Sequence, residues 1–270
     1  MFNVETKQSI KGFIGRTMKF FSNNKDKKLS VILNYHSIHP RHKFATKPDD
    51  FREQMEYIAL NFKVVSLYDF YQMRINKRDL PHKLAVVTFD DGYEDNYEYA
   101  FPVLKSLGIP ATIFLTTGFI NEEIDIAKRD KTYNGLKSLK WNQILEMRDK
   151  GISFGSHTHT HLILTGVSLR DAENEIVRSK LILENKLNEP IKMFAYPLGQ
   201  KKTFNYSIIG ILKKHNFELA CSTLWGCDNS RSDVFVLYRI RIDACDTMID
   251  FKDKVNGNWE FIRWVQRLKG

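Results

Sequence analysis

The chain has 270 residues, of which 43% are hydrophobic and 27% charged, and this composition excludes disordered, collagen-like and coiled-coil proteins. Lysine and arginine outnumber aspartate and glutamate by 41 to 32, which gives a net charge of +9 at pH 7. This excess favours anionic partners, such as phosphate-bearing glycans or membrane surfaces. Because the basic residues are spread along the chain, we do not expect a nucleic-acid-binding protein.

No signal for membrane insertion or export is found in the sequence. No apolar run approaches the roughly 18 residues needed to cross a bilayer, and the first 24 residues lack the apolar segment and cleavage site of a signal peptide. These features predict a cytoplasmic protein. Three cysteines are too few for a disulfide framework, and the spacing of Cys221 and Cys227 matches no zinc motif, so we expect reduced, mostly buried thiols.

Residues 1–28 are predicted to form a unit of their own. Residues 7–21 place apolar side chains at helical spacing among lysines and an arginine, which predicts a basic amphipathic helix, and residues 23–28 form a polar hinge. The apolar face of this helix either docks on the domain or lies on the anionic inner face of a membrane. The catalytic domain then covers residues 29–270.

Strands and helices alternate beyond the hinge. Predicted strands cover residues 29–35, 62–66, 84–89, 111–115, 152–154, 192–196, 217–222 and 236–242. Predicted helices cover residues 49–61, 93–107, 141–150, 168–187 and 205–214, with a helical stretch at 246–268. Repeated strand-then-helix units predict an α/β fold with parallel strands in a barrel or wound sheet. Catalytic side chains of such barrels gather just after the strands.

Two clusters of polar side chains follow predicted strands. Strand 84–89 runs into Asp90-Asp91-Gly92, and two adjacent carboxylates at a buried strand end need a paired charge or a cation. Strand 152–154 is followed by a histidine-rich loop; if this loop makes a helical turn, His157 and His161 share one face. Taken alone, the Asp-Asp-Gly run could be an ordinary turn, and the histidine-rich segment could be a solvated loop. Together they predict a divalent metal held by two imidazoles and one carboxylate.

These clusters resemble motifs of the NodB-homology polysaccharide deacetylases, carbohydrate esterase family four. The run Thr88-Phe89-Asp90-Asp91-Gly92 is similar to their first motif, and Ser156–His161 with Leu164 is similar to their second. Phe194–Gly199 resembles the third motif, in the form found in the poly-N-acetylglucosamine deacetylase branch. The likeness spans Leu29 to Asp243 and implies a distorted (β/α) barrel.

The resemblance also implies a division of roles. Asp90 is the general base, and Asp91, His157 and His161 hold a divalent metal. The metal is most commonly Zn²⁺, with Co²⁺, Ni²⁺, Mn²⁺ or Fe²⁺ as alternatives. The nucleophile is water bound to the metal, whose pKa such a metal can lower to about 7.

The third motif is implied to contact the substrate. The backbone N–H of Leu198 would stabilise the oxyanion of the attacked acetamide, a contribution typically worth about 10²–10³-fold in rate. Tyr196 and Pro197 belong to the same substrate-binding segment.

The sequence departs from the family pattern at two points. No histidine follows His215, so the late motif that supplies the acid in most members is absent. His36 ends the first strand, as in the permuted biofilm branch, and we predict that it is the acid. Ala195 stands where many members have an arginine that orients the base, and Arg239 is a candidate replacement.

The predicted function is a metal-dependent deacetylase that hydrolyses N-acetyl groups of amino sugars in a polysaccharide or glycan precursor. One alternative is an esterase for O-acetyl groups, or a hydrolase of another C–N bond, on the same fold. A second is an inactive glycan-binding module. That alternative predicts loss of at least one of the two aspartates and two histidines, and all four are present.

Overall fold

The computed structural model describes residues 28–120, 124 and 135–268. The predicted basic helix at residues 7–21 lies outside these residues. The boundary at residue 28, the membrane contact and the cytoplasmic location therefore remain predictions. Among the described residues, no helix combines the length and the apolar character that a membrane span requires.

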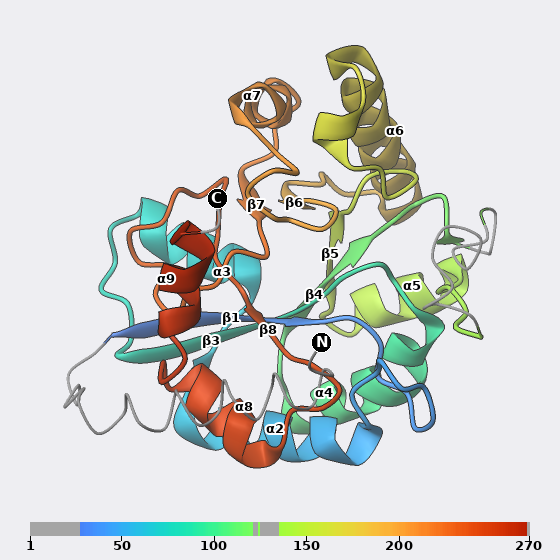
Figure 1. The fold of residues 1–270 in the computed structure, drawn as a ribbon. Coiled ribbons are helices and arrows are strands. Elements are labelled where there is room, and N and C mark those ends of the chain that lie inside the picture. Colours follow the sequence, from blue (N-terminus) through green and yellow to red (C-terminus); the bar gives the residue numbers. More distant parts are fainter. Residues whose placement is uncertain (1–27, 121–123, 125–134, 269–270) are drawn as a thin grey trace, which may run out of the picture.

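A curled sheet of parallel strands forms the centre of the domain (Figure 1). Its order is β7-β6-β5-β4-β3-β1-β8, and β2 pairs with β3 off this path. The strands are β1 (Leu29–Tyr35), β2 (Lys63–Val64), β3 (Lys83–Phe89), β4 (Ala111–Leu115), β5 (Ser153–Ser156), β6 (Met193–Ala195), β7 (Leu219–Cys221) and β8 (Ile240–Arg241). The predicted α/β fold with parallel strands is confirmed.

Helices cover the outside of the sheet. They are α2 (Pro48–Asn61), α3 (Leu67–Ile75), α4 (Phe101–Leu107), α5 (Trp141–Asp149), α6 (Leu169–Leu187), α7 (Tyr206–Lys214), α8 (Met248–Val255) and α9 (Phe261–Leu268), with a π-helix at Asn96–Ala100 and a 3-10 turn at Leu164–Gly166. Helices α2, α4 and α8 lie beneath β1 and β3 in the view of Figure 1, while α6 and α7 pack together at its top. Side-chain caps set several boundaries; Ser168, for example, accepts a hydrogen bond from the Asp171 N–H at the start of α6.

The segment 236–242 is less regular than the single strand predicted for it. Leu237 makes an isolated parallel bridge to Cys221 at the end of β7, and only Ile240–Arg241 pair with β1. The chain thus passes from one edge strand to the other, and this crossing draws the two edges of the curled sheet together.

Two other predictions need correction. Helix α3 was not predicted, although Ser66 caps it by accepting a hydrogen bond from the Asp69 N–H. The helical stretch predicted at 246–268 is two helices, because the chain turns between them at Gly257, whose φ of +78° favours glycine.

Alternation along the strands sorts side chains between two core clusters. Ile32, Val86 and Leu237 belong to the cluster inside the curled sheet, whereas Leu33, Val87 and Ile240 belong to the cluster beneath the helices. In the same alternation, the residues two positions after Ile32, Val86 and Leu237 are polar: Asn34, Thr88 and Arg239. All three are buried. The inner face of the sheet therefore changes from apolar to polar towards its carboxyl edge.

Candidate active site

The two adjacent aspartates lie where β3 reaches the carboxyl edge of the sheet. The Asp90 N–H still donates to the Tyr35 carbonyl, so Asp90 continues the β1–β3 ladder. The chain then turns sharply, with φ of +76° at Asp91 and +84° at Gly92. A Cβ on Gly92 would stand 2.7 Å from the Leu115 side chain, so the turn needs glycine for space as well as for conformation.

Asp90 is buried and paired with Arg239. The guanidinium donates two hydrogen bonds to the carboxylate, Nη1 to Oδ1 at 2.7 Å and Nη2 to Oδ2 at 2.6 Å, and Asn34 Nδ2 donates to Oδ2 at 3.2 Å. Burial by itself raises the pKa of Asp90, but Arg239, assisted by His157, outweighs it and holds the pKa well below its usual range. Asp90 is therefore ionised at neutral pH, as a base must be. Arg239, the candidate replacement for the arginine absent at Ala195, thus contacts the predicted base directly.

Asp91, His157 and His161 come together as the sequence predicts. Asp91 Oδ1 lies 3.5 Å from His157 Nε2 and 3.4 Å from His161 Nε2. One ligand atom from each residue lies within 4.8 Å of the others. The imidazole rings stand 4.9 Å apart between centroids, and Asp91 and His157 are buried.

This arrangement fits a divalent metal. Asp91 Oδ1 is buried and has no hydrogen-bond partner among the described residues, and such a carboxylate oxygen is costly without a cation. His157 Nδ1 lies 2.8 Å from the Ala195 carbonyl; donation there leaves the Nε2 lone pair directed towards Asp91. Burial lowers the pKa of His157 to about 4, so its imidazole is neutral at pH 7, the form that binds a metal.

The histidine loop does not form the helical turn that would place His157 and His161 on one face. Thr158 and His161 have φ of +67° and +57°, and the His161 N–H donates to Thr158 Oγ1 at 3.0 Å. Glu175, on α6, holds this conformation from outside. Its carboxylate accepts hydrogen bonds from the His159 and Thr160 N–H groups at 3.1 and 2.7 Å and from Thr160 Oγ1 at 3.0 Å. The two ligands meet because α6 fixes a strained loop.

Replacing Glu175 by alanine is expected to weaken metal binding about tenfold, because the loop that presents His161 loses three hydrogen bonds. Competition titration with a chelator of known affinity measures the effect. Thr160→Val removes only the hydroxyl contact, so a loss of affinity in this control as large as in Glu175→Ala would contradict the argument.

Tyr93 supports the carboxylate ligand from the opposite side. The Tyr93 hydroxyl is buried and donates to Asp91 Oδ2 at 3.0 Å, which orients the carboxylate so that Oδ1 faces the histidines. Tyr93→Phe keeps the ring and removes this bond. We expect metal affinity to fall about 10–100-fold, the usual cost of losing such a partner, and the free energy of unfolding to fall by about 1–3 kcal/mol. An unchanged affinity would show that Asp91 is oriented without Tyr93.

His36 lies directly after β1, beside the two aspartates. It is half-buried, and burial lowers its pKa against the opposing pull of Asp91 and Asp90. The segment after β1 is tied to the loop after β3: Asn96 Nδ2 donates to the His36 carbonyl at 2.8 Å, and Asp95 accepts from the Ser37 hydroxyl and the Ile38 N–H. Burial raises the pKa of Asp95 to about 6. His36 is thus held at the mouth of the site.

The residues of the third motif differ in their surroundings: Leu198 is exposed, whereas Tyr196 and Pro197 are buried. Leu198 has φ of +59°, its side chain is exposed, and its N–H has no hydrogen-bond partner among the described residues, as an oxyanion donor requires. Pro197 is buried beneath it. The Tyr196 ring is buried, stacks on Phe204 and donates its hydroxyl to the Phe235 carbonyl. The side chain of Tyr196 therefore supports the motif from the core instead of contacting substrate.

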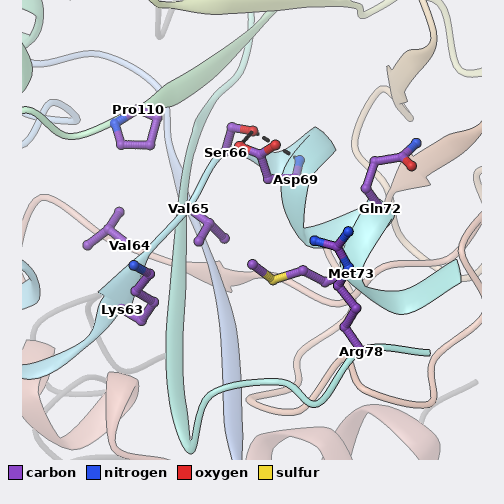
Figure 2. Close-up of a pocket in the computed structure, with 9 residues that line it drawn as sticks. All are labelled: Lys63, Val64, Val65, Ser66, Asp69, Gln72, Met73, Arg78 and Pro110. Atoms are coloured by element: carbon purple, nitrogen blue, oxygen red, sulfur yellow. Dashed lines mark hydrogen bonds between the residues drawn. The ribbon is translucent and has the colours of Figure 1, made fainter. Parts of the chain in front are cut away.

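The cavity drawn in Figure 2 lies away from these residues. It has a volume of about 350 Å³ and is lined by residues of α3, by Lys63 and Val64 of β2, which pair with the start of β3, and by Pro110, which precedes β4. It therefore opens at the amino edge of the sheet, opposite the site. Cys221, Cys227 and Cys245 form no disulfide within the described residues, and Cys221 and Cys227 are buried.

Comparison with known proteins agrees with this geometry. The family described as polysaccharide deacetylase matches residues 77–220, which include both aspartates and both histidines. The chain belongs to the polysaccharide deacetylase family. A poly-β-1,6-N-acetyl-D-glucosamine N-deacetylase of Staphylococcus epidermidis is 26% identical over 252 residues, which cover 83% of this chain and 83% of that protein.

Solved structures of polysaccharide deacetylases share the fold. The deacetylase PplD of Streptococcus pyogenes, solved in complex with acetate, has a TM-score of 0.71 and 26% identity over 84% of this chain and 98% of its own. IcaB of Ammonifex degensii has a TM-score of 0.74 and 25% identity over 87% of this chain and 98% of its own.

Sequence reasoning missed the residues that support the site. Asn34 could have been found, because alternation along β1 places it on the same face as His36. Tyr93 follows the aspartate pair by two residues, but no local pattern indicates where its hydroxyl points. Glu175 carries no signal in its own helix.

Proposed function

We propose that this polysaccharide deacetylase is a metal-dependent hydrolase that removes N-acetyl groups from amino sugars of a glycan. The observation that carries the proposal is the buried Asp91 Oδ1, which lacks a hydrogen-bond partner among the described residues and faces the Nε2 atoms of two imidazoles next to an ionised Asp90. Asp91, His157 and His161 would hold a metal, which would supply activation of water and polarisation of the acetamide carbonyl.

The residues of the chain supply the remaining chemistry. Asp90, kept ionised by Arg239, accepts the proton of the attacking water. The Leu198 N–H donates to the oxygen on which negative charge develops. His36 gives a proton to the departing amine nitrogen. The C–N bond then breaks to leave acetate and the free amino sugar.

The acid role of His36 predicts a dependence on the leaving group. An amine must be protonated to depart, whereas the phenolate of an aryl acetate leaves without help. His36→Gln is therefore expected to slow deacetylation of an N-acetylglucosamine oligomer about 10²-fold and to affect hydrolysis of 4-nitrophenyl acetate much less. Equal losses on both substrates would contradict an acid role and indicate that His36 orders the site as a whole.

Elemental analysis and acetate release test the proposal together. The wild-type chain should retain close to one divalent ion per molecule and release acetate from N-acetylglucosamine oligomers. Asp91→Ala should do neither, with an unchanged circular dichroism spectrum as the control for folding.

Other results would overturn it. Acetate release from acetylated xylan, with none from N-acetylglucosamine oligomers, would identify an O-acetyl esterase. Binding of a metal without acetate release from either polymer would indicate that the site hydrolyses a different kind of bond. No metal after reconstitution would favour a glycan-binding module.

A further inference from the structure

A second arginine follows Arg239 on the inner face of the curled sheet. Strand β8 pairs with β1 so that Arg241 lies beside Asn34, whose side chain reaches Asp90. Ile240, between the two arginines, is buried in the cluster beneath the helices. Because side chains alternate along a strand, Arg241 faces the same side as Arg239, one step closer to the mouth. The pKa of His36 is lowered chiefly by burial, and the positive charge of Arg241 lowers it further.

Unlike Arg239, Arg241 is exposed to solvent, and only the Nε edge of its guanidinium has an ion-pair partner. Its side chain is 67% exposed, and its Nε lies 2.9 Å from Asp243 Oδ1. Asp243 is itself held by the buried Lys254, at 3.2 Å, and the Lys254 ammonium also donates to the Arg241 carbonyl. The terminal Nη atoms have no hydrogen-bond partner among the described residues. A guanidinium fixed through Nε presents these donors as a fork suited to two oxygens of an anion.

Two loops at the carboxyl edge of the sheet, where Arg241 also lies, are cationic. The loops after β1 and β6, residues 36–47 and 196–205, contain no aspartate or glutamate. Five of their basic side chains are exposed and have no ion-pair partner within the described part of the chain: Arg41, Lys43, Lys47, Lys201 and Lys202. Of the buried acidic residues at the same edge, Asp90 is paired with Arg239 and Asp246 with Lys254, while Asp91 faces the metal position. The mouth therefore favours a negatively charged ligand.

We propose that Arg241 binds an anionic group, a phosphate or a carboxylate, on the glycan unit next to the N-acetylated sugar, and so makes the protein selective for acidic glycans. This inference rests on the proposed deacetylase function and specifies its substrate class. Phosphate and carboxylate offer the same pair of oxygens to the guanidinium.

Three probes test this: a neutral N-acetylglucosamine tetramer, a hyaluronan tetrasaccharide with carboxylates, and an N-acetylglucosamine oligomer carrying a phosphodiester. Acetate release and calorimetric binding are measured for each. The wild-type chain should prefer at least one acidic probe, and added salt should weaken that preference. Arg241→Gln should raise KM for that probe about 10–100-fold, leaving kcat and the neutral probe nearly unchanged. Arg241→Lys should fall between, because it keeps the charge without the fork.

Arg178→Gln, a substitution on the outer helix α6, is the matched control and should alter none of these values. Equal losses by Arg241→Gln on neutral and acidic probes, or no acidic preference in the wild-type chain, would overturn the inference. Binding of an acidic probe that depends on Arg241, without acetate release from any probe, would support it and overturn the proposed deacetylase function. Absence of both binding and acetate release would overturn both.

Discussion

Arg239→Met is expected to lower the free energy of unfolding by about 3–5 kcal/mol at neutral pH, the usual cost of leaving a buried charge without its partner. Arg239 is 1% exposed and contributes both hydrogen bonds of the pair with Asp90, so no water can take its place without rearrangement. Urea denaturation in metal-free buffer measures the change. Arg178→Met, on the outer helix α6, should stay within about 0.5 kcal/mol of the wild-type chain.

The pH dependence of this loss has a definite sign. Arg239 depresses the pKa of Asp90 in the folded protein, so the pair contributes its full stability above the unfolded-state pKa of about 4 and loses it as pH falls further. The difference between the wild-type chain and Arg239→Met should therefore be largest near neutrality and shrink below about pH 4. Adding Asp90→Asn to Arg239→Met should recover part of the loss, because the buried charge is gone. A loss below about 1 kcal/mol would contradict a pair of this kind.

Asp90→Asn is expected to reduce kcat/KM for an N-acetylglucosamine oligomer by about 10²–10⁴-fold while metal content stays at the wild-type level. The amide cannot take a proton from water, but Asp90 is not among the three groups that face the metal position. Asp91→Asn is the matched variant, one residue away and of the same chemistry, and it should lose the metal as well as the activity.

The two variants separate the roles of the adjacent carboxylates. Loss of metal from Asp90→Asn would show that Asp90 is a ligand, and wild-type turnover would show that it is not the base. Because the Asp90→Asn substitution leaves Arg239 without its charged partner, denaturation of the variant must be compared first. A folded Asp90→Asn chain with bound metal and little turnover is the expected result.

Much of the site was predictable because its chemistry is local in sequence. Two carboxylates directly after a buried strand, and two histidines directly after another, must meet at the carboxyl edge when the strands are parallel. The position of His36 followed in the same way from the end of β1. Element boundaries were less predictable where pairing between strands distant in the sequence sets them. In segment 236–242, for example, Leu237 pairs with β7, whereas Ile240 and Arg241 pair with β1.

The sequence by itself therefore determined the α/β fold, the aspartate pair and the histidine pair, because residue type and position after a strand specify them over a few positions. The choice of Asp91 as the carboxylate ligand came from the resemblance to the family. Only the tertiary structure decided which cation pairs with Asp90, since Arg239 lies 149 residues away and reaches it through the closing of the sheet. It likewise decided that Glu175 fixes the histidine loop and that Tyr93 orients Asp91. Hydrogen bonds across such distances depend on packing, and no periodicity in the chain records them.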